Sequence, residues 1–282
     1  LSRRYRILNL PILRGAVSFF EMMIIGLKAL NFSADVAMQY SEEEQGNAAA
    51  GESLVGRETG VRENGWKEQA ALGATLVFSL GLGIGLFFFL PLLVAQFLGL
   101  QQNALEFNLV AGAVRTTLLV LYMWTISQWR EIQRVFQYHG AEHKSIFTLE
   151  AGAELTVAAA RGFGRLHPRC GTSFMLIVVL FAIAVFACVD SLFVVVFGHT
   201  QSLFERFATH FSLLPFIAGI SFELLKISGK KRNHPLTRVL IAPGLWLQRI
   251  TTREPDDDQL EVALVALRCV LGEEAKAVQV ID

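Results

Sequence analysis

Two histidines and a glutamate lie within five positions in the segment YHGAEHKSIFTLEAG, residues 138–152. In a helix, His139 and His143 would share one face, and this spacing lets two imidazoles bind one metal ion. Glu142 lies beside them, where a carboxylate can act as a general base on water or orient a ligand. The order His-x-x-Glu-His is the inverted zincin pattern, whereas Gly140 disfavours a helix.

A second polar cluster follows in the segment RLHPRCGTSF, residues 165–174. It contains His167 and Cys170, and its proline and glycine indicate a tight turn. Both clusters adjoin the ends of apolar segments, so the fold can bring them together. His139 and His143 with His167 and Cys170 would then form a tetrahedral set of four ligands for zinc or another divalent metal.

Three interpretations of these residues remain open. A catalytic metal site keeps one position free, which would leave His167, Cys170 or a carboxylate such as Glu150 or Glu223 without a bond to the metal. A closed structural site would use all four ligands. Without any metal, the histidines would cap helices and bind phosphates at a membrane surface.

The composition indicates a membrane protein. Of 282 residues, 53% are hydrophobic and 18% are charged, against about 25% charged residues in soluble domains. The mean hydropathy is +0.45 and the formal net charge is zero. No basic patch suggests a nucleic-acid partner, so we expect the lipid bilayer to be the main surroundings of the chain.

Four apolar segments approach or exceed the length of about 20 residues that crosses a bilayer. They are residues 69–105, 107–129, 173–198 and 207–225. The sequence therefore predicts an all-α polytopic membrane protein with about four transmembrane helices, and a membrane domain at residues 69–225.

Two charged residues interrupt these apolar segments. Arg115 lies in the second and Asp190 in the third, at similar distances from the same end of the membrane domain. Because a lone charge is costly inside a bilayer, we expect an intramembrane ion pair between them. Alternatively, each side chain reaches interfacial water separately.

Basic residues set the expected orientation. Residues 130–169 contain six Lys or Arg and residues 226–253 contain seven, whereas the turn at 99–106 contains none. The positive-inside rule places the basic segments in the cytoplasm. We therefore expect the metal-site loop, 130–172, and both chain termini to lie on the cytoplasmic side of the membrane.

The flanking segments predict helices outside the four spans. Charged residues recur every seven positions from Arg14 to Asp35 on an otherwise apolar stretch, which is typical of an amphipathic helix in the membrane interface, here predicted at residues 1–38. A fifth crossing is the alternative. Residues 39–68 have the composition of a flexible cytoplasmic linker.

The C-terminal segment, 226–282, contains a predicted amphipathic helix in REPDDDQLEVALVALRCVLGEE, residues 253–274. Apolar residues there follow the i, i+3, i+4, i+7 spacing, so this helix can dock on the cytoplasmic domain or on a partner. We place all three cysteines in the cytoplasm or within a span, where disulfides are not expected.

Five segments of the chain resemble the YqhQ-like family (DUF1385) of bacterial membrane proteins, in the same order along the sequence. These are LPILRG, YHGAEHKSI, HPRCGTSF, GISFELLK and APGLWLQRITTREPDDDQLEVA. The family is described as predicted metal-dependent enzymes. The resemblance therefore implies a metal site at His139, Glu142, His143, His167 and Cys170.

Two functions fit the sequence. The first is a zinc-dependent hydrolase at the cytoplasmic membrane face, with Glu142 as the base that activates water for attack on an amide or ester. The second is a non-enzymatic module with a structural metal site, which docks through its amphipathic helices onto another membrane protein or a second copy of the chain.

Overall fold

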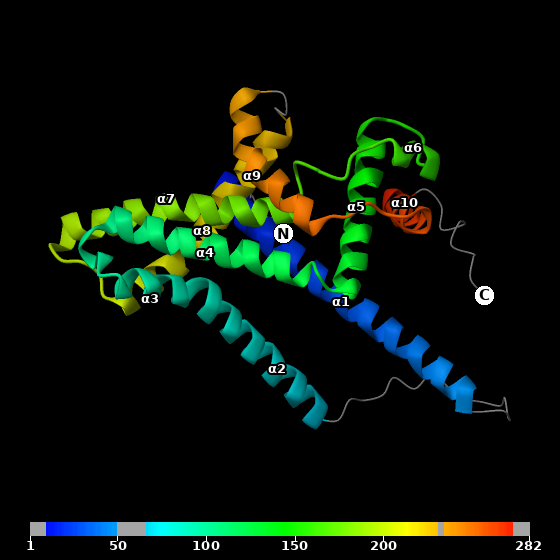
Figure 1. Ribbon diagram of the computed structural model, residues 1–282, viewed down its shortest axis with the longest axis horizontal. Coiled ribbons are helices and arrows are strands. Elements are labelled where there is room, and N and C mark those ends of the chain that lie inside the picture. The colour runs from blue at the N-terminus through cyan, green and yellow to red at the C-terminus, as the bar shows by residue number, and fades with distance from the viewer. Residues whose placement is uncertain (1–9, 50–65, 231–233, 273–282) are drawn as a thin grey trace.

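A computed structural model describes residues 10–49, 66–230 and 234–272, and this part of the chain consists of helices and loops (Figure 1). The helices are α1 (Pro11–Ala49), α2 (Trp66–Ile84), α3 (Leu90–Phe97), α4 (Ala104–Ile126), α5 (Arg130–Glu150), α6 (Val157–Arg161), α7 (Gly171–Phe197), α8 (Leu203–Lys230), α9 (Pro235–Thr251) and α10 (Asp257–Leu271). The π-helix η2 (Gly85–Phe89) joins α2 to α3, and the 3₁₀ turn η3 (Leu100–Gln102) precedes α4.

Four helical segments of the described residues are long and apolar enough to cross a membrane. They are Gly73–Phe97, Ala104–Ile126, Gly171–Phe197 and Leu203–Lys226. The predicted all-α architecture with four spans and additional N- and C-terminal helices is therefore confirmed, and the chain is a multi-pass membrane protein.

The centre of the bundle is formed by α4, α7 and α8, with α9 packed against α7 (Figure 1). Aromatic and aliphatic side chains fill it, including the buried pair Phe88 and Phe186, whose rings meet edge to face. Gly244 allows α9 to approach α7 closely, because a Cβ at this position would lie 2.6 Å from the Cβ of Ser173. This contact brings the C-terminal end of α9 to the start of α7.

The first span bends at η2, where α2 turns away from the bundle (Figure 1). A π-helical turn breaks the regular i to i−4 bonding and commonly kinks a helix. Here the carbonyl of Phe87 accepts a hydrogen bond of 2.9 Å from Nε of Arg115. The bend thereby provides a partner for a buried arginine on α4.

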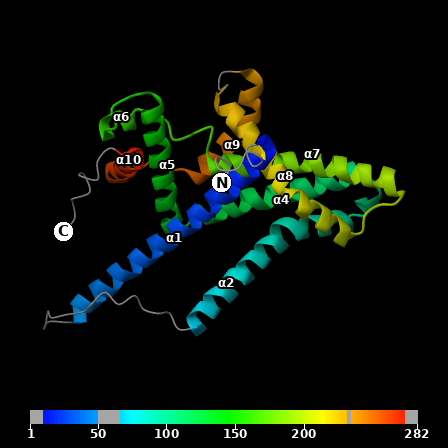
Figure 2. The ribbon, with the colours of Figure 1, turned by 180° about the vertical axis from the view of Figure 1, so that it is seen from behind.

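Helix α1 crosses α8 and then extends away from it (Figure 2). The two backbones are in close contact, because a Cβ on Gly15 would lie 2.4 Å from the carbonyl oxygen of Gly219. Beside this contact, Arg14, the residue before Gly15, forms a bidentate ion pair with Glu223, one turn after Gly219 on α8. The helix continues to Ala49 and so includes the first residues of the segment predicted as a linker; residues 50–65 of that segment lie outside the described part.

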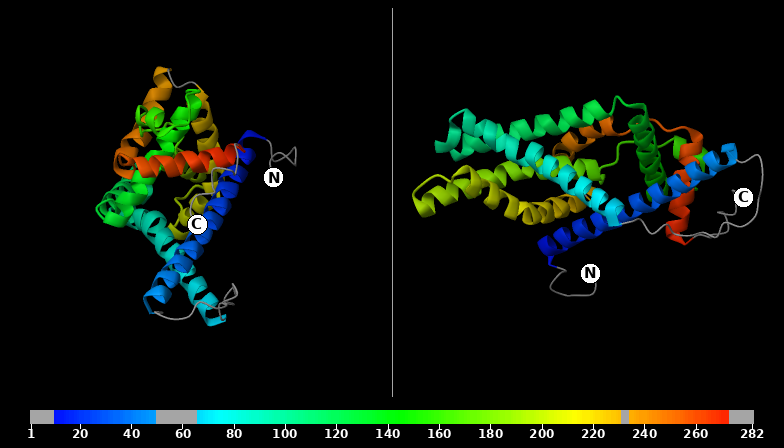
Figure 3. Two further views of the ribbon diagram at one scale, coloured as in Figure 1. Left: turned by 90° about the vertical axis from the view of Figure 1, so that its right-hand side faces the viewer. Right: turned by 90° about the horizontal axis from the view of Figure 1, so that it is seen from below.

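Helices α5, α6 and α10 gather at one end of the molecule and are called the head below (Figure 3). Ala141, Ala160, Leu260 and Leu264 form its buried apolar cluster. A capping box at Asp256 starts α10, as its acidic first turn predicts. The turns that join α3 to α4 and α7 to α8 lie at the opposite end, called the far end.

Candidate metal centre

The structure brings His139, His143 and Cys170 together where the head meets the bundle. One ligand atom from each residue lies within 4.8 Å of the other two. Nε2 of His139 lies 3.2 Å from Sγ of Cys170. Helix α5 supplies both histidines from one face, and Cys170 is the residue directly before α7, so two elements distant in the sequence form one site.

Backbone carbonyls fix the orientation of both imidazoles. Nδ1 of His139 donates to the carbonyl of Thr251 at 2.8 Å, and Nδ1 of His143 donates to the carbonyl of Arg165 at 2.5 Å. A neutral histidine that donates through Nδ1 carries its lone pair on Nε2. When the imidazoles are neutral, Nε2 is the nitrogen suited to bind a metal in both residues; in His139 this atom faces Sγ of Cys170 and donates to the sulfur when the ring is protonated.

The surroundings of Cys170 favour the thiolate. Burial raises the pKa of its thiol, but hydrogen bonds from His139 and His143 outweigh this effect and lower the pKa to about 5. The hydroxyl of Thr172 adds a contact of 3.1 Å to Sγ. The pKa of His139 moves the other way: burial lowers it, and the hydrogen bond and charge of Cys170 more than compensate, so the net pKa is raised above 6.5.

Gly140 explains how the α9–α10 connection can approach α5. A Cβ at this position would lie 2.1 Å from the carbonyl oxygen of Arg253. The backbone N–H of Arg253 donates to the carbonyl of Phe136 at 2.8 Å, which ties the same connection to α5. This packing places the carbonyl of Thr251 next to His139. The absence of a side chain at Gly140 therefore allows the α9–α10 connection to pack directly against α5.

His167 lies next to the group of three ligands but outside it. Its ring centroid is 5.7 Å from that of His143, and its Nε2 faces Glu150 at 3.4 Å. Burial is the main cause that lowers the pKa of His167. Gln248 holds the backbone of this residue in place, since its amide accepts from the His167 N–H and donates to the His167 carbonyl.

The three carboxylates singled out in the sequence occupy different surroundings. Glu142 is exposed beside His139 on α5, near enough for its charge to contribute to the raised pKa of that histidine. Glu150 faces His167 and forms an ion pair with Arg169. Glu223 is bound to Arg14 in the α1–α8 contact.

Arg115 and Asp190 have separate partners, unlike the pair expected from the sequence. Asp190 accepts from His210 at 2.8 Å and lies 3.3 Å from Arg206. Asp190 is seven residues from the end of α7, and Arg115 is eleven residues from the start of α4; both of these helix ends lie at the far end of the bundle. At a rise of 1.5 Å per residue, Arg115 therefore lies about 6 Å deeper in the bundle than Asp190. Its guanidinium instead lies over Phe88, 4.9 Å from the ring centroid.

Several residues that support the site were not predicted from the sequence. Thr251 and Arg165 act through backbone carbonyls, which carry no side-chain signal. Gln248 is fully buried and gives only the indirect signal of a polar residue in the mostly apolar LIAPGLWLQRI segment. His210 gives no clear signal as a lone histidine near a turn, yet it is buried against Phe186 with stacked rings.

Comparisons with known proteins agree with these assignments of fold. Residues 10–273 match the family model described as "Protein of unknown function (DUF1385)". The chain is 34% identical over 276 residues to the "Uncharacterized protein YqhQ" of Bacillus subtilis (strain 168), which covers 96% of this chain and 80% of that protein. No solved structure matches the chain. The matched range and this relative show that the chain belongs to the DUF1385 family.

Proposed function

We propose that the chain is a membrane-embedded zinc-dependent hydrolase that acts at the cytoplasmic face, with the metal held by His139, His143 and Cys170. The observation that carries the proposal is the convergence of these three ligand atoms within 4.8 Å of one another. The basic segments on both sides of the site support the cytoplasmic placement. Zinc suits a donor set of two imidazoles and one thiolate.

The residues present fit a metal ion in three respects. Both histidines are oriented by backbone carbonyls, as is typical of metal ligands. The cysteine has a lowered pKa, and a metal binds the thiolate rather than the thiol. A set of three protein ligands also leaves a fourth position open, which distinguishes catalytic from structural zinc sites.

The surrounding side chains suggest the roles of acid and base. A bound zinc ion would supply Lewis-acid polarisation of an amide or ester carbonyl. Glu142 is exposed next to His139 and would take a proton from water. The protonated Glu142 would then give this proton to the leaving group.

Elemental analysis of the purified full chain tests the metal. We expect about one zinc per chain, in line with the one three-ligand group found among the described residues, and a large loss of zinc in His139→Ala, His143→Ala and Cys170→Ala. His199→Ala and Cys188→Ala are matched controls, because both residues are exposed and distant from the site. Cobalt substitution adds a specific readout: thiolate-to-cobalt charge transfer should vanish in Cys170→Ser. Equal metal content in all variants would contradict the proposed ligands.

Glu142→Gln tests the chemistry separately from the metal. The variant should retain zinc and lose turnover of amide and ester probes, because the amide side chain cannot accept the proton from water. Glu131→Gln, on an exposed residue of the same helix, is the control. If no hydrolysis by the wild-type chain depends on Glu142, the hydrolase proposal is wrong even when zinc is bound.

A non-enzymatic docking module is the second candidate. It is favoured by the exposed apolar residues of α1, such as Ile25, Leu30 and Phe32, and by the site itself, where a metal would join α5 to the start of α7. In this case His139→Ala should lower the thermal midpoint and the recovery of a partner together. Isolation of a monomeric, partner-free protein from native membranes would count against it.

A further inference from the structure

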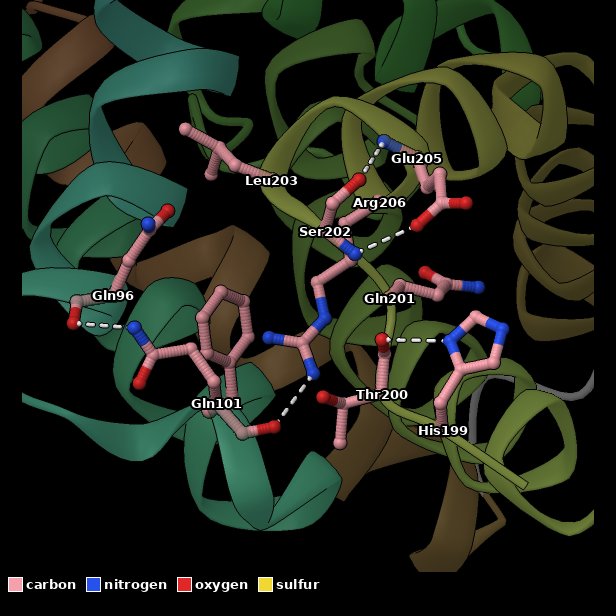
Figure 4. Close-up of a pocket in the computed structure, with 10 residues that line it drawn as sticks. Gln96, Gln101, His199, Thr200, Gln201, Ser202, Leu203, Glu205 and Arg206 are labelled. Carbon is pink, nitrogen blue, oxygen red and sulfur yellow. Dashed lines mark hydrogen bonds between the residues drawn. The ribbon is translucent and has the colours of Figure 1, made fainter. Parts of the chain in front are cut away.

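A second polar site lies at the far end of the bundle, away from the metal centre (Figure 4). A cavity of about 340 Å³ is lined by the α7–α8 turn, the start of α8 and residues of the α3–α4 turn. Its size suits a small ligand. We propose that this cavity binds a monovalent oxyanion group, a carboxylate or a phosphodiester, through Arg206 and Gln201.

Arg206 is a rigidly held cation in this cavity, although its side chain is almost fully buried, with 1% of the residue exposed. Its guanidinium lies 3.8 Å above the ring centroid of Phe107, and Nη2 donates to the carbonyl of Gln101 at 3.1 Å. Figure 4 shows the guanidinium in the middle of the lining residues, between Gln101 and Thr200. Such a fixed planar donor matches the geometry of an oxyanion.

Asp190 balances the charge of Arg206 from the bundle side. Its carboxylate lies 3.3 Å from Nε of Arg206 and accepts from His210 and Asn108, each at 2.8 Å. All of these side chains are buried. Nη2 of Arg206 donates to Gln101, and Nε faces Asp190 without a hydrogen bond. None of the described contacts engages Nη1, so its N–H groups are left for a ligand.

Gln201 provides the second, independent indication of a ligand. Only 4% of the residue is exposed, and neither its amide nitrogen nor its amide oxygen has a hydrogen-bond partner among the described residues. A buried amide without partners is costly, yet this one lines the cavity. An oxyanion bound at Arg206 can accept from the amide nitrogen and remove part of this cost.

Glu205 limits the charge of the ligand. Its carboxylate accepts from the backbone N–H of Ser202 at 2.8 Å, in a reciprocal cap at the start of α8. It is exposed and also lines the cavity, so a dianion would meet repulsion there. A monovalent group is therefore favoured, and it has two sources: a dissolved carboxylate or the phosphodiester of a lipid headgroup.

Thermal unfolding of the purified full chain in non-ionic detergent tests the site with two probes. Sodium acetate represents the dissolved carboxylate and dihexanoyl phosphatidylglycerol the lipid phosphodiester, each compared with sodium chloride at equal ionic strength. We expect at least one probe to raise the midpoint by several degrees at saturation, because ligand that binds only the folded state stabilises it. The effective probe identifies the source.

Two variants assign the effect to the cavity. Gln201→Leu removes an unpartnered amide, so the unliganded protein should be at least as stable as wild type, while probe affinity should fall about tenfold. Arg206→Lys keeps a cation for Asp190 but loses the planar fork, and should weaken binding similarly. Gln102→Leu, on an exposed neighbouring residue, should leave the shift intact.

Two results would overturn the proposal. One is the lack of any shift beyond sodium chloride with both probes. The other is a shift that persists unchanged in Gln201→Leu and Arg206→Lys, which would indicate binding elsewhere. Neither result bears on zinc content at His139, so the two proposals are tested independently.

Discussion

Two backbone carbonyl groups determine what the paired histidines can do. The carbonyls of Thr251 and Arg165 each accept from an Nδ1–H, so in the neutral rings both Nε2 atoms are electron-pair donors. Without these acceptors the imidazoles could adopt the other tautomer or rotate, and the spacing of His139 and His143 would not be sufficient. The chemistry of the site therefore depends on atoms that belong to other segments of the chain.

The protonation of the ligands predicts a pH dependence of zinc binding. Zinc requires the thiolate of Cys170 and a neutral His139. The pKa of His139 is raised above 6.5 and that of Cys170 is lowered to about 5. As the pH falls, protons should therefore compete first at the histidine and then at the cysteine. A zinc titration against a chelator between about pH 8 and pH 5 should show falling affinity; a pH-independent affinity, after correction for the chelator, would contradict these ligands.

Gly140→Ala is predicted to damage the site without removing any ligand. The added methyl group would collide with the carbonyl of Arg253, and overpacking of this kind costs about 1–3 kcal/mol. The shift of the α9–α10 connection should also weaken zinc binding, because it carries the carbonyl that orients His139. Gly164→Ala is the control, since a Cβ there meets nothing within 4 Å. Equal stability and zinc affinity in both variants would show that the contact is unimportant.

Sequence reasoning at this scale found side chains but not their partners. It selected His139, His143, His167 and Cys170 from their residue types and their positions next to apolar segments, and all of these except His167 converge in one group. It paired Arg115 with Asp190 because both are isolated charges in apolar segments. The structure gives Asp190 different partners on α8, since depth along a helix depends on where each helix starts and ends.

At the scale of elements, α9 fastens the loop before α7 to the bundle through one side chain. Gln248 is fully buried and bonds the backbone N–H and carbonyl of His167 as well as the hydroxyl of Ser173. Its two donors and its acceptor therefore all have partners within the protein. The loop that carries His167 and Cys170 thus has its position set by α9 rather than by its own sequence.

Gln248→Leu should release this loop. Both backbone groups of His167 would remain buried without a partner, at a cost of about 1–3 kcal/mol each. We expect a lower thermal midpoint and faster hydrogen exchange in residues 162–170. Gln128→Leu, at an exposed position near the end of α4, should change neither. Unchanged exchange in the loop of the Gln248 variant would show that α9 does not hold it.

The elements themselves were predictable to different degrees. Hydropathy located all four spans because length and apolar content suffice to identify a membrane helix. The π-helix at Gly85–Phe89 was not predictable, because one extra residue in a helical turn leaves the apolar pattern unchanged. The packing of α1 against α8 was also not predictable, because it is formed by a contact between Gly15 and Gly219 and by one ion pair, which join residues far apart in the sequence.

At the scale of the whole molecule, polar chemistry is divided between the two ends of an apolar bundle. The head carries the histidine–cysteine site, and the far end carries buried charges around Arg206. Burying charge within a membrane domain is costly unless it is paired, so each site needs its own network of partners. The proposed functions of the two sites therefore depend on which side of the membrane each end faces.

The orientation is predicted with the head and both termini in the cytoplasm and the far end outside. Cys269 on α10 and position 102 in the far-end turn are both exposed and report on opposite ends. In intact cells, a membrane-impermeant thiol reagent should label a Gln102→Cys variant that lacks Cys188 and Cys269. A second variant lacks Cys188, keeps Cys269 and has the native Gln102; it should be labelled only after the cells are permeabilised. Both variants keep Cys170, which is buried. The opposite labelling pattern would place the histidine–cysteine site outside the cell. The orientation predicted by the positive-inside rule would then be wrong, and so would the proposal of hydrolysis at the cytoplasmic face.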